Sequence, residues 1–235
     1  MTLTEQVPLV PFDTVAHDIY RDVHKGIRGE LFGVTTATGR MDPANRAARI
    51  ATAARVDCLV YFLVAHAEHE DARVQPKLVA HCADLAEQIE VEHEGLEARM
   101  QALRGLAEEA VDASRAQQRP SVHRLYVELA SFTSAYLAHQ DLEERVVMPA
   151  LERAIGAEAV LDLHQEIVGD IPPAEMAEGL GLMLPAMNID DRAELLGGMR
   201  EGAPAEIFAG VWGLAGSLLD PADYAALAVR LGIVL

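Results

Sequence analysis

The chain has 235 residues, of which 37 are acidic and 19 basic, giving a net charge of −18. Its hydrophobic content of 51% excludes a mostly disordered chain, and the length suffices for one large domain or a domain with an extension. A strongly acidic chain is repelled by nucleic acid and by anionic membrane surfaces, so we expect neither as a partner.

Two further features indicate the compartment. The N-terminal stretch MTLTEQVPLVPFDTV lacks a basic segment followed by an apolar one, and we find no run approaching the roughly 18 apolar residues of a membrane span. Cys58 and Cys82 form no CxxC motif, which is typical of buried free thiols in a reducing environment. We therefore expect a soluble, cytoplasmic protein.

The residue types that favour helices dominate the chain, and they predict an all-α fold. We expect long helices over residues 13–32, 42–74, 83–115 and 121–148. The stretch TTATGR ends the first helix, the pair Asp42-Pro43 opens the second, and Pro76 and Pro149 follow the second and fourth. Residues 13–151 are thus predicted to form an antiparallel up-down four-helix bundle.

The character of the chain changes after Gly169, where prolines and methionines separate short apolar pieces. Short helices are expected over residues 189–200, 205–218 and 222–231, the last opened by Asp220-Pro221. We assign residues 152–235 to a smaller helical appendage, and we interpret its methionines as packing residues.

Each of the four long helices replaces one apolar residue of its inward stripe by a histidine. These residues are His24, His66, His93 and His139. The second and fourth helices add a glutamate one turn later, Glu70 and Glu143. Residues four apart on a helix share a face, so each of these glutamates points the same way as its histidine.

An internal repeat supports this interpretation. The pattern His66-xxx-Glu70-xxxxx-Pro76-x-Leu78 recurs 73 residues later, from His139 to Leu151. Two similar helix pairs facing each other predict a cage with pseudo-twofold symmetry. Antiparallel neighbouring helices place two residues at the same height only if both lie equally far from the connection. The first and second helices meet this condition less well, because His24 lies about 12 Å before its expected helix end and His66 about 36 Å after Pro43. We therefore expect the second helix to overhang the first.

Imidazole and carboxylate without thiolate suit iron, manganese or zinc. A histidine can hold one metal ion while the glutamate one turn away spans to a second. Because two glutamates only partly balance the charge of two such ions, an oxide or hydroxide bridge can complete the balance. Buried carboxylates without a counter-charge are costly, which makes metal ions their natural partners.

These residues resemble the hemerythrin-like, or HHE cation-binding, family. The resemblance covers HKGIRGELF around His24, HAEHED around His66, EVEHEGL around His93 and HQDLEERVVMPAL around His139. It implies two non-haem iron ions, oxo- or hydroxo-bridged, that bind oxygen, nitric oxide or peroxide, with manganese or zinc as other metals. It also implies that His24, His66, His93 and His139 are terminal ligands, and that Glu70 and Glu143 are bridging ligands.

One position departs from the oxygen-carrying members of the family. Where they place a second histidine one turn after the third-helix ligand, this chain has Glu97. The departure favours peroxide or oxygen activation, or iron handling, over reversible oxygen carriage. Glu97 is an additional candidate ligand, although a solvated carboxylate is the simpler interpretation.

Several neighbouring residues have ordinary explanations. We expect His69, Glu94 and Glu144 to lie on the surface or beside the ligands, His17 in the core or at the end of the bundle, and His164 to be a surface or capping residue. Ferritin-like di-iron proteins use two Glu-x-x-His motifs. This chain has one, Glu90-x-x-His93, with no counterpart at His66 or His139, so the spacing disfavours that alternative.

Three functions remain open from the sequence. The first is a di-iron protein that binds or reduces a small oxidant. The second is an iron- or oxygen-responsive sensor in which the C-terminal appendage responds to the metal state. The third is an oxygen-activating enzyme whose organic substrate lies between bundle and appendage. The appendage is also a candidate homodimer interface.

Overall fold

The computed structural model describes residues 12–234, so most of the N-terminal stretch examined for a leader lies outside the described residues. Within that range the chain forms helices and connecting loops and no strand, which confirms the all-α prediction. The elements are α1 (Arg21–Arg40), α2 (Arg46–Arg73), α3 (Gln75–His81), α4 (Ala83–Asp112), α5 (Gln118–Leu142), the π-helix η1 (Glu143–Val147), α6 (Met148–Ile155), α7 (Ala157–Asp170), α8 (Pro173–Ala186), α9 (Ile189–Gly202), α10 (Ala205–Leu218) and α11 (Pro221–Leu231).

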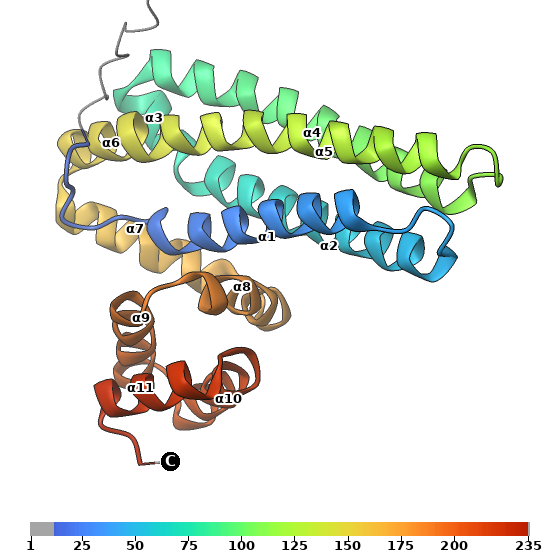
Figure 1. Ribbon diagram of the computed structural model, residues 1–235. Helices are drawn as coiled ribbons and strands as arrows, with labels where there is room; N and C mark the ends of the chain where they lie inside the picture. Colours follow the sequence, from blue (N-terminus) through green and yellow to red (C-terminus); the bar gives the residue numbers. More distant parts are fainter. Residues whose placement is uncertain (1–11, 235) are drawn as a thin grey trace, which may run out of the picture.

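The four long helices α1, α2, α4 and α5 lie side by side (Figure 1). Helix α2 packs on α1 and α4, and α5 packs on α4 and α1, so each helix contacts two others around a shared interior. The chain reverses direction at each connection between them, as the bundle prediction requires.

The predicted bounds of the first helix were wrong at both ends. Helix α1 begins at Arg21 because the side chain of Asp18 accepts hydrogen bonds from the backbone N–H groups of Tyr20 and Arg21. It continues through TTATGR, where the buried Thr38 hydroxyl donates to the Val34 carbonyl at 2.8 Å.

The longer α1 also removes the expected overhang of the second helix. Asp42 and Pro43 form a turn before α2, which begins at Arg46 behind the N-cap Asn45. His24 now lies about 24 Å from the end of α1, and His66 lies about 30 Å from the start of α2. The two distances agree to about one turn, so a connection of five residues, 41–45, suffices.

Pro149 does not stop the fourth helix, contrary to prediction. Helix α5 passes into the π-helix η1, and Pro149 then lies in the first turn of α6, where no backbone N–H is required. Wider π turns of this kind interrupt α-helices frequently at functional sites. Here the π-helix begins at Glu143, one of the predicted metal ligands.

The sequence repeat is visible in the helix ends. Pro76 and Pro149 each lie in the first turn of a short helix, α3 and α6, and Leu78 and Leu151 are both buried beneath it. No helix was predicted for α3, α6, α7 or α8, because α3, α6 and α8 contain prolines and α7 follows Gly156 directly.

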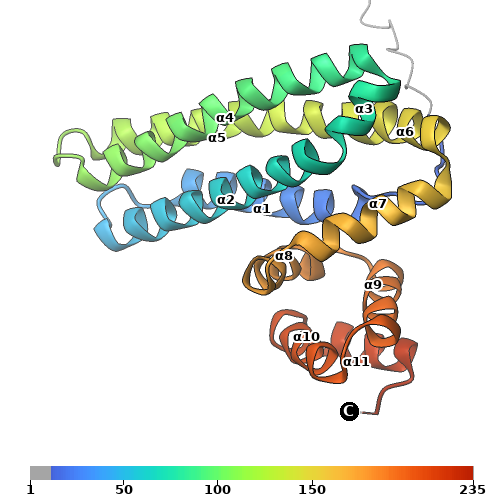
Figure 2. The same ribbon diagram turned by 180° about the vertical axis from the view of Figure 1, so that it is seen from behind.

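The C-terminal helices α8 to α11 form a group beside the bundle (Figure 2), with their own apolar cluster around Leu184 and Leu196. The predicted helices over 189–200, 205–218 and 222–231 correspond to α9, α10 and α11 within two residues. Helix α7 contacts α2, and α8 packs closely along α1.

The bundle interior consists of two apolar clusters with a polar layer between them. One cluster includes Ile27, Leu63 and Leu96, and the other includes Val74 and Val147. On each long helix the inward histidine falls between residues of the two clusters. The layer is therefore enclosed by apolar side chains at both ends.

Two sequence predictions need correction, one about the cysteines and one about apolar runs. Cys58 is exposed, because it lies on the outer face of α2, opposite the stripe that buries Leu59 and Leu63; Cys82 is half-buried. One helix, α2, is long and apolar enough to cross a membrane, although no such run was expected. A single helix of this kind is weak evidence, and this one supplies a face of the bundle core.

Candidate metal centre

The structure brings all six predicted ligands into the polar layer. Two of them come from α2 and one each from α1, α4, α5 and η1. They are well shielded from solvent: His24 is 0% exposed and Glu143 1%. Helix periodicity accounts for the placement, because each histidine continues the buried stripe of its own helix.

The histidines form two pairs. The rings of His24 and His66 have centroids 5.5 Å apart, and those of His93 and His139 are 5.0 Å apart. Potential ligand atoms fall into two matching groups, one with His24, His66 and Glu70 and the other with His93, His139, Glu70 and Glu143. Glu70 belongs to both.

Each glutamate presents one carboxylate oxygen to each histidine pair. Glu70 Oε1 lies 3.1 Å from Nε2 of His66, and its Oε2 lies 3.4 Å from Nε2 of His93. Glu143 Oε2 lies 3.4 Å from Nε2 of His24, and its Oε1 lies 3.2 Å from Nε2 of His139. Two carboxylates therefore link two halves, each of which offers two imidazole nitrogens.

Three of the histidines form a hydrogen bond to a carboxylate through Nδ1, the ring nitrogen that faces away from the layer. Nδ1 of His93 donates to Asp71 at 2.9 Å, and Nδ1 of His139 donates to Glu92 at 3.0 Å. Nδ1 of His24 donates to Glu144 at 2.9 Å. An ionised carboxylate can only accept, so Nδ1 carries a proton in each pair, and the ring is oriented with Nε2 facing into the layer.

These supporting carboxylates follow a rule that the sequence did not reveal. Asp71, Glu92 and Glu144 each adjoin a ligand in the sequence, yet each supports a histidine on a neighbouring helix. Of the three, only Glu144 was considered from the sequence, as a surface residue or one beside the ligands, and it lies beside a ligand. The available signal was an acidic residue next to each of these ligands.

The carboxylates favour positive charge in one half of the layer. Burial lowers the pKa of His93, but the hydrogen bond to Asp71 and the nearby negative charge of Glu70 outweigh it and raise the pKa to about 10. Burial likewise raises the pKa of Glu143, but the hydrogen bond to His139 outweighs it and lowers that pKa. Both shifts favour the charged forms, so the carboxylates of this half attract positive charge.

In the half that contains His24 and His66, the pKa values of His66 and Glu144 are both lowered. Burial lowers the pKa of His66 to about 4, so its imidazole is neutral at pH 7. Burial raises the pKa of Glu144, but its hydrogen bonds from His24 and Arg28 outweigh this and lower it to about 2. A neutral imidazole is the form that binds a metal.

Several polar atoms of the layer are buried without a hydrogen-bond partner. They are Nε2 of His24 and His93, both oxygens of Glu70, and Oε2 of Glu143. Although the nitrogens and oxygens lie within 3.1–3.4 Å of one another, they do not meet hydrogen-bond geometry. Burying polar atoms without a partner costs free energy of folding. A metal ion bound between these nitrogen and oxygen atoms would satisfy them as ligands. The residues therefore fit the metal centre that the resemblance implies.

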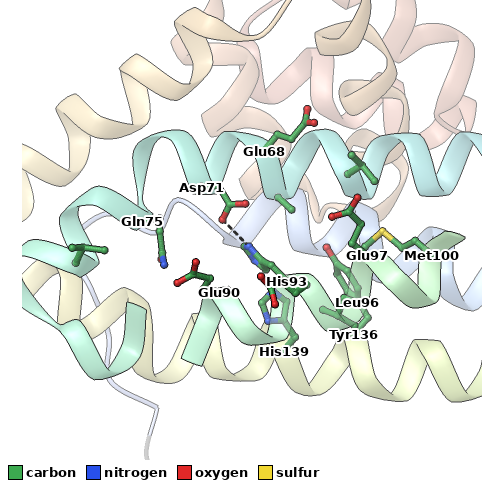
Figure 3. Close-up of a pocket in the computed structure, with 14 residues that line it drawn as sticks. Glu68, Asp71, Gln75, Glu90, His93, Leu96, Glu97, Met100, Tyr136 and His139 are labelled. Carbon is green, nitrogen blue, oxygen red and sulfur yellow. Dashed lines mark hydrogen bonds and ion pairs between the residues drawn. The ribbon is translucent and has the colours of Figure 1, made fainter. Parts of the chain in front are cut away.

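Glu97 lies outside both groups of potential ligand atoms among the described residues. Its side chain is exposed and lines the wall of a recess of about 490 Å³ between α2 and α4. Figure 3 shows Glu97 beside Met100, apart from the neighbouring pair His93 and His139. Glu90, the residue behind the ferritin-like alternative, is also exposed on this wall.

Three of the remaining histidines have specific partners. His69 Nε2 donates to Glu175 of α8 at 2.6 Å, and His17 pairs with His164 of α7 at 2.7 Å between Nε2 and Nδ1. His164 was expected to be a surface or capping residue, but it is half-buried and pairs with His17, because α7 packs against the bundle end that carries His17.

The fold and site define an all-helical bundle protein with a buried histidine and glutamate cluster able to hold metal. Comparison with protein families gives one match, the hemerythrin HHE cation binding domain, over residues 15–151. The chain belongs to this family. No curated protein and no solved structure matches it.

Proposed function

We propose that the chain is a hemerythrin-like di-iron protein that binds or reduces a small oxidant such as oxygen, nitric oxide or peroxide. The observation that carries the proposal is the pair of carboxylates, each with one oxygen toward each histidine pair. Imidazole and carboxylate donors suit iron, with manganese or zinc as alternatives. Bound iron would supply a redox-active centre to which an oxidant can bind.

The chain's own residues prepare the site for such a ligand. Asp71, Glu92 and Glu144 fix three imidazoles in the orientation that turns Nε2 inward. The apolar clusters above and below exclude bulk water. Low water content strengthens electrostatic interactions inside the layer.

Two tyrosines border the layer. Tyr20 stacks on His24 at 4.9 Å between ring centroids, and Tyr136 lies 5.8 Å from His139. Burial, and then the charges of Glu70 and Glu143, raise the pKa of both phenols well above the usual value. Both phenols therefore keep their protons, and we expect their O–H groups to serve as donors to an oxidant.

The recess beside α4 supports access for small polar ligands. Its walls carry Glu68, Asp71 and Glu94, and its lining includes His93 and His139. Carboxylate walls concentrate cations and repel anions. We therefore expect metal ions and neutral peroxide to enter from this face.

The test is metal analysis with an optical spectrum. After anaerobic reconstitution with ferrous iron and removal of the excess, we expect about two irons per chain and, after exposure to air, the near-ultraviolet absorption of oxo-bridged ferric iron. Glu97→Ala serves as a control that alters a nearby carboxylate and should retain the iron. A chain that retains no iron under these conditions contradicts the proposal.

A second candidate, a sensor, is favoured by contacts between the ligand helices and the C-terminal helices. Lys25, next to His24, pairs with Asp191 of α9, and His69, next to Glu70, pairs with Glu175. We expect a sensor to change the protease sensitivity of α8 to α11 between reduced, oxidised and metal-free protein. Equal cleavage rates in all three states would rule this candidate out.

A further inference from the structure

A second cavity lies on the opposite side of α2 from the acidic recess. It is enclosed by α1 and α2 on one side and by α7, α8 and α9 on the other, and its volume is about 210 Å³. Most of its lining is apolar, and α7, α8, α9 and the loop after α7 contribute Ile167, Ile171, Met176, Leu180, Met183 and Met199.

The inner end of this cavity is the polar layer that holds the predicted metal ligands, called the metal layer from here on. His66 and Glu70 line it together with Tyr20, which stacks on His24. Of these, His66 and Glu70 are predicted ligands of the same half of the centre. A molecule in the cavity therefore reaches the layer without passing the acidic recess, whose lining includes neither His66 nor Glu70.

The volume of the cavity indicates the size of its ligand. An apolar cavity of about 150 Å³ is large enough to hold benzene, so 210 Å³ exceeds what a diatomic gas needs. Three methionine side chains line the cavity: Met176, Met183 and Met199. Methionine side chains are flexible and polarisable, and they adapt to ligands of differing shape.

The charged residues of the lining indicate the ligand's charge. The cavity is bordered by the carboxylates of Asp18, Asp22, Glu70 and Glu175, and its described lining includes no lysine or arginine. Buried or half-buried carboxylates repel an anion; Arg21, outside the lining, pairs with Asp22, and the other three carboxylates have no lysine or arginine beside them in the described lining. The lining thus disfavours fatty acid and aromatic carboxylates and suits a neutral molecule.

We propose that this cavity binds a neutral, apolar organic molecule of about one substituted benzene ring, with one end against His66 and Glu70. The binding step does not depend on the proposed iron chemistry, whereas the position of the molecule beside a metal ion does. The two can therefore fail separately.

The first experiment compares three ligands of matched size. Toluene, benzyl alcohol and benzoate are titrated into the full chain as purified and after metal removal, with binding followed by saturation-transfer nuclear magnetic resonance. We expect toluene and benzyl alcohol to bind and benzoate to bind at least about tenfold more weakly. Equal binding of benzoate, or no binding by either neutral ligand, would overturn the proposal.

Substitutions then locate the bound ligand. Val168, 43% exposed on α7, lines the cavity, whereas Val127, 45% exposed on α5, does not. We expect Val168→Trp and Met176→Trp to weaken toluene binding about tenfold and Val127→Trp to leave it unchanged. Circular dichroism establishes that each variant is folded. Unchanged binding in both cavity variants places the ligand elsewhere and refutes the assignment.

The last measurement tests the cavity assignment independently of the proposed di-iron function. Iron or manganese, but not zinc, speeds the relaxation of nearby ligand protons, so we expect faster toluene relaxation in the manganese-loaded protein than in the zinc-loaded one. If the chain holds no metal but binds toluene, the proposed function fails and the cavity assignment stands. If it holds manganese and toluene relaxation stays the same, the placement beside the metal layer is wrong.

Discussion

Gly26 of α1 lies directly against the backbone of α8. A Cβ atom added there would be 3.1 Å from the carbonyl carbon of Leu182 and from the amide nitrogen of Met183. These are backbone atoms of a helix, which cannot move aside as a flexible side chain can. Gly29, almost one turn later, would place a Cβ at an ordinary 3.5 Å from the Cβ of Ala186.

The two glycines allow a matched comparison. Alanine in place of glycine inside a helix raises the free energy of unfolding by about 0.5–1 kcal/mol, which both Gly26→Ala and Gly29→Ala gain. Only Gly26→Ala also forces α1 and α8 apart, and overpacking of this kind costs about 1–3 kcal/mol. We expect Gly29→Ala to stabilise the protein slightly and Gly26→Ala to destabilise it by about 1–2 kcal/mol.

Urea unfolding followed by circular dichroism measures both changes. Because Met183 lines the cavity and adjoins the contact, Gly26→Ala should also weaken toluene binding, while Gly29→Ala should leave it intact. If the two variants have equal unfolding free energies, α8 does not pack on α1 as described. The account of the cavity wall then fails with it.

The remaining predictions concern the metal layer and pH. Glu70→Ala or Glu143→Ala should lower bound iron far more than Glu97→Ala, measured by mass spectrometry of the metal; equal losses would make Glu97 a ligand. Asp71→Asn should weaken iron affinity by about 10- to 100-fold, since His93 loses its charged support, and an unchanged affinity in chelator competition would contradict that role. Burial, and then His17, lower the pKa of His164, so the unfolded chain takes up its proton first and the free energy of unfolding falls as the pH drops below about 6.5. His164→Asn should reduce that fall between about pH 7.5 and 5.5 in urea unfolding, and an identical fall in both proteins would exclude His164 as its source.

Much of the bundle was predictable because local periodicity carries it. An inward stripe is a property of one helix, so His66 and Glu70 could be assigned to the interior without knowing what faces them. The same holds for His139 and Glu143, and the repeat relating the two pairs added independent support. Helix ends depend on single capping contacts, such as Asp18 at the start of α1, and were therefore misplaced.

The supporting carboxylates show where local reasoning fails. Asp71 points about 100° away from Glu70 around α2, which on an isolated helix makes it a surface residue. It accepts from His93 only because α4 packs beside α2 and brings that ring to it. Periodicity therefore finds residues that face the bundle axis, while residues that bridge adjacent helices emerge only from the packing.

The cavity between bundle and C-terminal helices extends the same argument. The methionines of α8 and α9 were interpreted as packing residues, and they do pack, but Met176, Met183 and Met199 also line a space that ends at His66. Five helices enclose that space, so no single segment predicts it. The metal layer thus has an acidic approach on one side of α2 and an apolar approach on the other. A polar oxidant and a neutral organic molecule would meet there by separate routes, and for that reason benzoate, excluded by both sets of carboxylates, is the sharpest control ligand.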